Sequence, residues 1–84
     1  MIKKAKKLEW KEVDDEIIAF NPKKDEFFVL NKTGSFIWKK INGKNNEKKI
    51  AESLAKECNI KEKKAFADTK QLIKKLVSRK LVVK

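Results

Sequence analysis

The chain contains no histidine and no tyrosine, and it lacks both a cysteine cluster and a glycine-rich phosphate-binding loop. Histidine is the side chain that most often moves protons in enzymes, and a metal ion needs suitable ligands gathered in one place. Carboxylates are present, but they are scattered among lysines and form no obvious acid–base pair. We therefore predict that the protein is not an enzyme and that it carries no metal ion or cofactor.

Cysteine and long apolar runs are also scarce. The single cysteine, Cys58, cannot form an internal disulfide, which favours a reducing, cytoplasmic setting. The longest apolar runs, Ile17–Phe20 and Phe27–Leu30, hold four residues each. Runs of this length are too short for a membrane-spanning helix or for the core of a signal peptide. We expect a cytoplasmic protein with no membrane span.

Positive charge is what the chain has in excess. Lysine and arginine number 23 against 12 aspartate and glutamate residues, which gives a formal net charge of +11 over 84 residues. Such a field favours an acidic partner, whether nucleic acid, an anionic membrane or an acidic peptide, although surface lysines can also serve solubility alone. With 40% hydrophobic residues, the chain can build a single domain around one modest core.

The first third of the chain has the pattern of short strands separated by polar turns. Apolar and polar residues alternate in Leu8–Val13, and apolar runs follow within Glu16–Phe20 and Glu26–Leu30. The two connections, Asp14-Asp15 and Asn21–Asp25, are rich in residues that form turns. This pattern predicts an antiparallel meander with Glu26–Leu30 on one edge of the sheet.

The strand at Glu26–Leu30 is apolar on both faces. Phe28 and Leu30 share one face, whereas Phe27 and Val29 share the other. Helices that cover both faces would account for this pattern, and so would one covered face together with an apolar face that lines a groove. Alternation alone leaves open which pair faces the rest of the protein, because a one-residue shift in register exchanges the two faces.

Three helices are predicted after the strands. Asn31 is a suitable N-cap for the first, over Lys32–Ile41, and Asn45 or Asn46 for the second. The residues expected to face the core are Phe36, Ile37 and Ile41 in the first helix, and Ile50, Ala51, Leu54, Ala55 and Cys58 in the second. Because Cys58 lies on that stripe and no histidine is present, we interpret it as a small core residue and not as a nucleophile.

The third helix, over Glu62–Arg79, carries a wide apolar stripe. At about 100° per residue, its apolar side chains span roughly 140° of the helix surface. One border holds Ala65, Leu72 and Leu76, and the other holds Phe66, Ile73 and Val77, next to Lys70 and Lys74. A stripe this wide can serve a core on one border and a groove on the other, or it can be core throughout. The final Leu81–Val83 segment can form a short strand or close the helix end.

The residues around the start of the first helix form a recognisable combination. Leu30-Asn31-Lys32-Thr33-Gly34, followed by Ile37-Trp38 and much later by Leu81-Val82, resembles the PqqD-like family, the RiPP recognition elements of ribosomally made peptide natural products. The resemblance runs from about Leu8 to Val83. Two positions depart from the family pattern, since Lys80 replaces a usual glycine and Thr69 replaces a usual aliphatic residue.

The resemblance implies an α+β, winged-helix-like fold in which an N-terminal three-stranded antiparallel sheet precedes three helices. Residues 8–84 would form this domain, and residues 1–7, which include four lysines, would be a flexible basic tail. Family members bind the leader of a precursor peptide as a strand antiparallel to the third strand, beside the third helix. The peptide-binding residues implied are Glu26, Phe27, Phe28, Val29 and Leu30 in the strand, and Phe66, Thr69, Lys70, Ile73, Lys74 and Val77 in the helix.

The partners implied by the resemblance are a leader peptide and a separate maturation enzyme, and the net charge of +11, with Lys70 and Lys74 beside the cleft, predicts that the leader is acidic. Strand addition suits an apolar edge strand, because it satisfies backbone groups that the edge leaves open. The enzyme would be a leader peptidase, as in lasso-peptide pathways, or a radical-SAM maturase, and the sequence does not choose between them.

A winged helix-turn-helix DNA-binding protein is the main alternative, favoured by the net charge and by the lysines of the third helix. Chain order argues against it, because the wing hairpin usually follows the recognition helix and only Lys80–Lys84 follows here. The third helix also offers only Gln71 and Arg79 for reading base edges. A module that docks on an acidic protein surface is a further alternative. We therefore expect binding of a peptide and not of nucleic acid.

Overall fold

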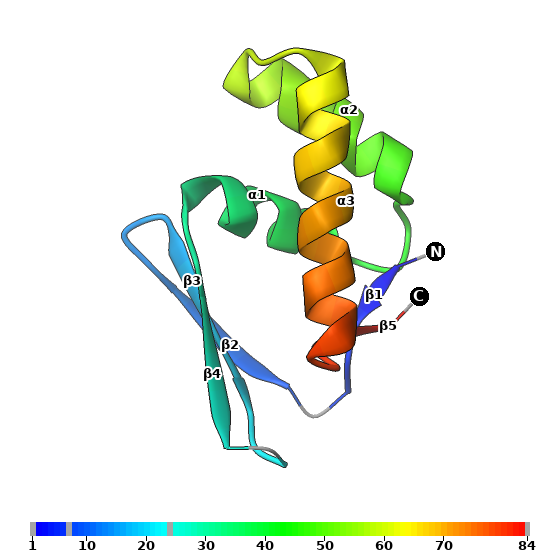
Figure 1. The fold of residues 1–84 in the computed structure, drawn as a ribbon. Helices are drawn as coiled ribbons and strands as arrows, with labels where there is room; N and C mark the ends of the chain where they lie inside the picture. Colours follow the sequence, from blue (N-terminus) through cyan, green and yellow to red (C-terminus); the bar gives the residue numbers. More distant parts are fainter. Residues whose placement is uncertain (1, 7, 24, 84) are drawn as a thin grey trace.

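A computed structural model of the chain describes residues 2–6, 8–23 and 25–83 (Figure 1). A small sheet of two terminal strands lies beside a three-stranded sheet and a group of helices. The elements are, in chain order, β1 (Lys3–Lys4), β2 (Glu9–Val13), β3 (Glu16–Asn21), β4 (Glu26–Leu30), α1 (Lys32–Lys40), α2 (Glu47–Cys58), α3 (Glu62–Ser78) and β5 (Val82–Val83). The predicted α+β class and the predicted order of sheet and helices are confirmed.

The three-stranded sheet is the predicted antiparallel meander, in the order β2-β3-β4. Asp14 and Asp15 form the first turn, and both have positive φ angles, 50° and 67°. Such two-residue turns match the twist of the strands that they join, and aspartate tolerates this conformation better than most residues. In the second hairpin Ile17 lies opposite Leu30 and Phe20 lies opposite Phe27. The register therefore gives β4 one face shared with Ile17 and one shared with Phe20.

The helices lie on one face of the meander only (Figure 1). α1 packs against β3 and β4, and α3 packs against α2 and α1. Their apolar stripes meet the inner face of the sheet in a single core that includes Ile17, Leu30, Ile37, Leu54 and Leu76. The sheet's other face is left without a covering helix, so Phe27 and Val29 remain 68% and 61% exposed. None of the described helices combines the length and apolar character that a membrane crossing requires.

Trp38 is the largest fully buried side chain among the described residues, although the sequence pattern pointed to its neighbours. Ile37 and Ile41 are buried as predicted, whereas Phe36 is only half-buried. The ring of Trp10, on β2, meets Trp38 edge to face with centroids 6.0 Å apart and an interplanar angle of 78°. This contact joins β2 to the buried Trp38 of α1, although Trp10 itself is 42% exposed.

The N-terminal segment differs from the expected basic tail. β1 pairs antiparallel with β5, and Ile2 is buried in the core. The N–H of Gly43 also donates a hydrogen bond to the carbonyl of Ile2 over 2.8 Å. The burial of Ile2, this hydrogen bond and the pairing with β5 therefore offset the entropy lost on ordering the segment. Met1 and Lys7, also assigned to the tail, lie outside the described residues.

Lys4 is held against the two tryptophans. Its Nζ lies 5.4 Å from the ring centroid of Trp10 and 5.2 Å from that of Trp38, and it donates a 2.7 Å hydrogen bond to the carbonyl of Ile41. Burial lowers the pKa of the Lys4 amine, because a low-dielectric setting disfavours its charged form. The lysine therefore works as a structural bridge between β1 and the end of α1.

The prediction that Cys58 is a core residue is wrong, since its side chain is exposed. Asn46 caps α2 as expected, and Ile50, Ala51, Leu54 and Ala55 are buried. After Cys58, however, Asn59 adopts a left-handed conformation with φ of 53° and turns the chain. Ile60 then donates its N–H to the carbonyl of Ala55 and packs against the core. The last turn of the helix is thus capped by Ile60, and Cys58 faces outward.

α3 ends in a Schellman motif with a lysine at the position where glycine is usual. Leu81 donates its N–H to the carbonyl of Leu76 over 2.9 Å, and Lys80 donates its own to Val77 over 3.0 Å. Lys80 has a φ of 61°, in the left-handed region, where a side chain is strained. The fold therefore makes with a lysine the turn that usually contains glycine, at a cost in conformational energy.

Replacement of Lys80 by glycine should stabilise the protein. Removal of Cβ relieves the left-handed strain, and this gain exceeds the extra entropy of glycine in the unfolded chain, so the free energy of unfolding should rise by roughly 0.5–1 kcal/mol. Urea unfolding followed by circular dichroism measures it. Lys80→Ala keeps Cβ and removes the ammonium group, so it should leave stability nearly unchanged. Equal stabilisation by both variants would show that charge, not backbone conformation, is responsible.

Thr69 carries a buried hydroxyl for which the described residues provide no hydrogen-bond partner. A buried donor left unpaired costs about 1–3 kcal/mol, so Thr69→Val should raise the free energy of unfolding by roughly 1 kcal/mol. Thr69→Ser retains the hydroxyl and loses a methyl group, so it should lower stability. Thermal melts would compare the stabilities of the two variants with that of the unmodified protein. If Thr69→Val were less stable than the unmodified protein, the Thr69 hydroxyl would have a hydrogen-bond partner.

Candidate functional site

The junction between β4 and α1 fixes the upper end of the candidate site. Asn31 caps α1, its side-chain oxygen accepting the N–H of Gly34 over 2.8 Å. A Cβ added to Gly34 would lie 3.3 Å from the Asn31 oxygen and 3.3 Å from a methyl carbon of Leu30. Glycine therefore lets the first turn of α1 approach the end of β4 closely. The Leu-Asn-Lys-Thr-Gly segment is thus a structural joint between an edge strand and a helix.

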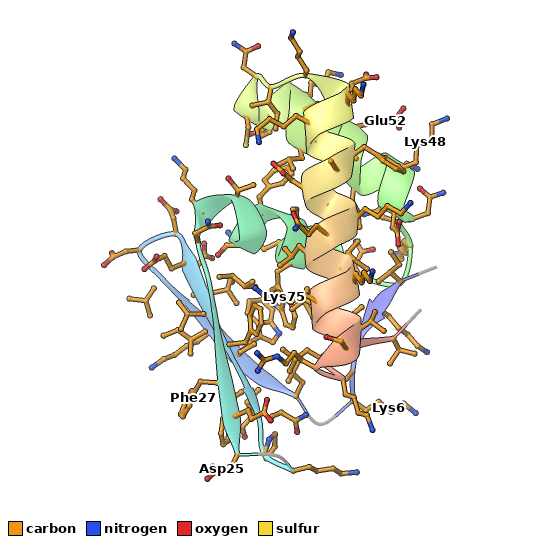
Figure 2. All side chains as sticks on the ribbon, in the orientation of Figure 1. Lys6, Asp25, Phe27, Lys48, Glu52 and Lys75 are labelled. Carbon is orange, nitrogen blue, oxygen red and sulfur yellow. The ribbon has the colours of Figure 1, made fainter. Side chains whose placement is uncertain are left out.

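The two faces of β4 have different surroundings. Phe28 is half-buried and Leu30 is buried on the face toward the helices. Phe27 points away from α3, on the other side of the strand (Figure 2), where it packs on Phe20 with ring centroids 4.9 Å apart. The alternating pattern of β4 did not indicate which of its faces points toward the helices. The structure shows that this is the face of Phe28 and Leu30.

A groove of about 650 Å³ lies between the start of α1 and one border of α3. Its apolar floor includes Ile37 and Leu72, and Gly34 and Thr33 form the wall on the α1 side. The remaining lining residues are Asn31, Asp68, Gln71, Lys74, Lys75 and Ser78. An apolar floor with a polar rim can hold an apolar side chain of a ligand while charged groups of the rim fix its orientation.

The groove uses the border of α3 opposite to the one expected. Of the residues predicted to bind peptide, Thr69 and Ile73 are fully buried in the core. Phe66 and Lys70 lie beyond the core on the other border, where the Lys70 Nζ is 5.9 Å from the Phe66 ring centroid. Val77 is half-buried, and Lys74 alone of the predicted helix residues lines the groove.

The residues that sequence reasoning missed are Asp68, Leu72, Lys75 and Arg79, which follow one another at spacings of four, three and four along α3. Such spacing defines a continuous ridge on a helix, and Leu72 on it was recognised as part of the apolar stripe. No local signal identifies this ridge as the one beside β4. Which side of the apolar stripe of α3 faces β4 depends on how α3 packs against α1 and α2.

Phe28 is flanked by two cations at the lower end of the site. Lys75, which points from α3 toward the sheet, has its Nζ 5.9 Å from the ring centroid of Phe28 (Figure 2). The guanidinium carbon of Arg79 is also 5.9 Å from that centroid. Arg79 bridges α3's end and β4's start, because its guanidinium lies 3.4 Å from the carboxylate of Glu26. Both partners of this ion pair are about half exposed, so the pair contributes little to stability.

The side chains gathered between β4, α1 and α3 are of types that bind a ligand by contact and charge. Within residues 2–6, 8–23 and 25–83, no three side chains of the metal-binding types gather to form a candidate metal site. A second hollow, on the side of α1 away from the groove's apolar floor, is lined by charged residues together with Phe36 and Cys58. β4 provides an edge strand, the start of α1 and one border of α3 provide an apolar groove, and α3 with its C-cap provides the cations Lys75 and Arg79.

Comparison with known proteins agrees with this geometry. The family described as coenzyme PQQ synthesis protein D (PqqD) matches residues 16–82. The structure of TbiB1 in complex with the TbiA(beta) leader peptide is similar with a TM-score of 0.87 and 19% sequence identity, over 95% of this chain and 93% of that one. A search of curated proteins gives no match. At this identity the structural likeness establishes the fold, whereas the match over residues 16–82 establishes the family. The chain belongs to the PqqD family.

Proposed function

We propose that the protein binds the leader segment of a ribosomally made precursor peptide, which adds as a strand antiparallel to β4. The observation that carries this proposal is the position of β4, an edge strand whose outer side has no strand partner among the described residues. The groove along α3 begins at Asn31, the residue that follows β4. A peptide strand would satisfy the open backbone groups of β4, while the groove would receive alternate side chains.

The opposite edge of the sheet is protected against such pairing. β2 is charged at three of its five positions, Glu9, Lys11 and Glu12, and Glu12 is also paired with Lys39 of α1 at 2.5 Å. Charged side chains on an edge disfavour the addition of another strand. β4 holds a single charged residue, Glu26, followed by four apolar ones. The contrast supports β4 as the accepting edge.

β4 and α3 meet through side chains and not through close backbone packing. The two elements, both described in full, have no Cα atoms within 8 Å of each other. A strand paired with β4 would lie about 4.8 Å from it in the hydrogen-bonding direction. Side chains such as Phe28, Lys75 and Arg79 bridge the space between the two elements. A leader paired with β4 would therefore meet α3 through these side chains.

The proposed role is that of an adapter, because the site provides recognition groups. The leader would be held while a separate enzyme, a leader peptidase or a radical-SAM maturase, acts on the precursor. The solved structure of TbiB1 with a leader peptide supports this assignment through the shared fold. The cytoplasm is the compartment proposed, since precursor peptides are made by ribosomes and the lone Cys58 needs no oxidising environment.

Two neighbouring phenylalanines of β4 provide the test. Phe28→Ala removes the aromatic floor beside the groove and should weaken leader binding by about 2 kcal/mol or more, a hot-spot loss. Phe27→Ala removes a ring of the same size from the opposite face and should weaken binding much less. Fluorescence anisotropy would measure both, with a labelled synthetic leader peptide as the probe.

The comparison needs two controls. Thermal melts of both variants separate loss of binding from loss of folded protein, because Phe28 also packs against the core. Amide shifts of the unmodified protein on titration should concentrate in β4 and in the border of α3 that carries Leu72. Shifts confined to α2, or equal losses of affinity for the two alanine variants, would refute strand addition at β4.

A further inference from the structure

The surroundings of Phe28 hold an excess of positive charge. Lys75 and Arg79 each lie 5.9 Å from its ring centroid, whereas Glu26 is the one acidic group paired with either of them in the described ion pairs. Asp68, further up the same border, is paired with Lys64 at 3.3 Å. Two cations against one carboxylate leave a local charge that an anionic group of a ligand can neutralise.

Strand pairing determines which ligand residue would meet these cations. In an antiparallel pair, directly opposite residues have their side chains on the same face, with Cβ atoms about 4.5–5.5 Å apart. The leader residue opposite Phe28 would therefore point toward α3. Its methylene groups would lie along the Phe28 ring, and its tip would come between Lys75 and Arg79.

We propose that Lys75 and Arg79 select an aspartate or glutamate at the leader position opposite Phe28. This inference rests on the proposed function and gives it a specific ligand chemistry, an extended peptide with a carboxylate at one fixed position. The Phe28 ring holds both cations beside that position through cation–π contacts. The carboxylate would accept hydrogen bonds from the Lys75 ammonium and the Arg79 guanidinium.

Glu26 limits the strength of this selection. In the protein without a ligand, its carboxylate lies 3.4 Å from the Arg79 guanidinium and is the internal counter-ion of that group. A ligand carboxylate would share Arg79 with Glu26, because a guanidinium carries five N–H donors. Neutralisation of Glu26 should therefore strengthen the preference for an acidic residue, whereas neutralisation of either cation should weaken it.

The other border of α3 provides a matched control. Lys70 lies 5.9 Å from the ring centroid of Phe66, the same contact that Lys75 makes with Phe28. The two lysines are about 140° apart around the helix, so Lys70 faces away from β4. Lys70→Gln removes the same charge as Lys75→Gln from the same helix. Any effect of net charge alone would appear equally in both variants.

The experiment is a selection from a display library of random linear peptides of fixed length. The baits are the unmodified full chain and five variants of it: Lys75→Gln, Arg79→Gln, the double variant of these two, Glu26→Gln and Lys70→Gln. The unmodified protein and Lys70→Gln should enrich peptides with an acidic residue at one position relative to an apolar one. The double variant should lose this enrichment, and Glu26→Gln should increase it. Cross-strand NOEs to Phe28 should identify the register of one selected peptide.

Affinities of that selected peptide and of its Asp→Asn or Glu→Gln version give the magnitude. Each single cation variant should reduce the ratio of the two affinities by about two- to five-fold, the range for an exposed ion pair, and the reduction should shrink at high salt. Selected peptides without a positional acidic residue, or an equal effect of Lys70→Gln, would overturn this inference while leaving strand addition intact. Failure of every bait to select a peptide would overturn the proposed function and this inference together.

Discussion

The Ser35 hydroxyl is the point on which the geometry of the site depends. It accepts the N–H of Ile17 over 2.9 Å and donates to the carbonyl of Leu30 over 3.0 Å, so one buried side chain joins β3, β4 and α1. Ile17 and Leu30 are register partners at the end of the sheet. Loss of the hydroxyl would remove both hydrogen bonds, and a buried backbone group that finds no other partner costs about 1–3 kcal/mol. The angle at which β4 leaves α1, and with it the position of the free edge, follows from this contact.

The sheet is built so that its faces and edges have separate roles. The inner face holds Ile17, Ala19 and Leu30 and is committed to the core. The β2 edge is charged, whereas the β4 edge is apolar beyond Glu26. Both edge strands present the same kinds of unpaired backbone N–H and C=O groups. The side chains therefore decide which edge can accept another strand. In the proposed complex the leader would extend the sheet at β4 and would continue both of its faces.

Local rules predicted the parts of the fold that depend on neighbouring residues. The Asp14-Asp15 turn, the caps at Asn31 and Asn46 and the bounds of β4 all follow from contacts within a few residues. The border of α3 that forms the groove was not predictable, because both borders carry apolar residues and lysines. Its orientation results from packing on α1 and α2, to which residues far apart in the sequence contribute. The burial of Ile2 and the exposure of Cys58 depend on tertiary contacts in the same way.

Rigid and adaptable parts of the candidate site come from different elements. The joint at Asn31–Ser35 is buried and hydrogen-bonded, so it holds β4 and α1 in one arrangement. Lys75, Arg79 and Glu26, by contrast, are side chains that reach across a gap between two backbones with no close Cα approach. In the proposed complex, pairing with the β4 backbone would be open to any extended peptide, so discrimination between peptides would have to come from these side chains and from the groove floor. Since such exposed groups contribute little to stability, their identities can change from one family member to another while the fold is kept.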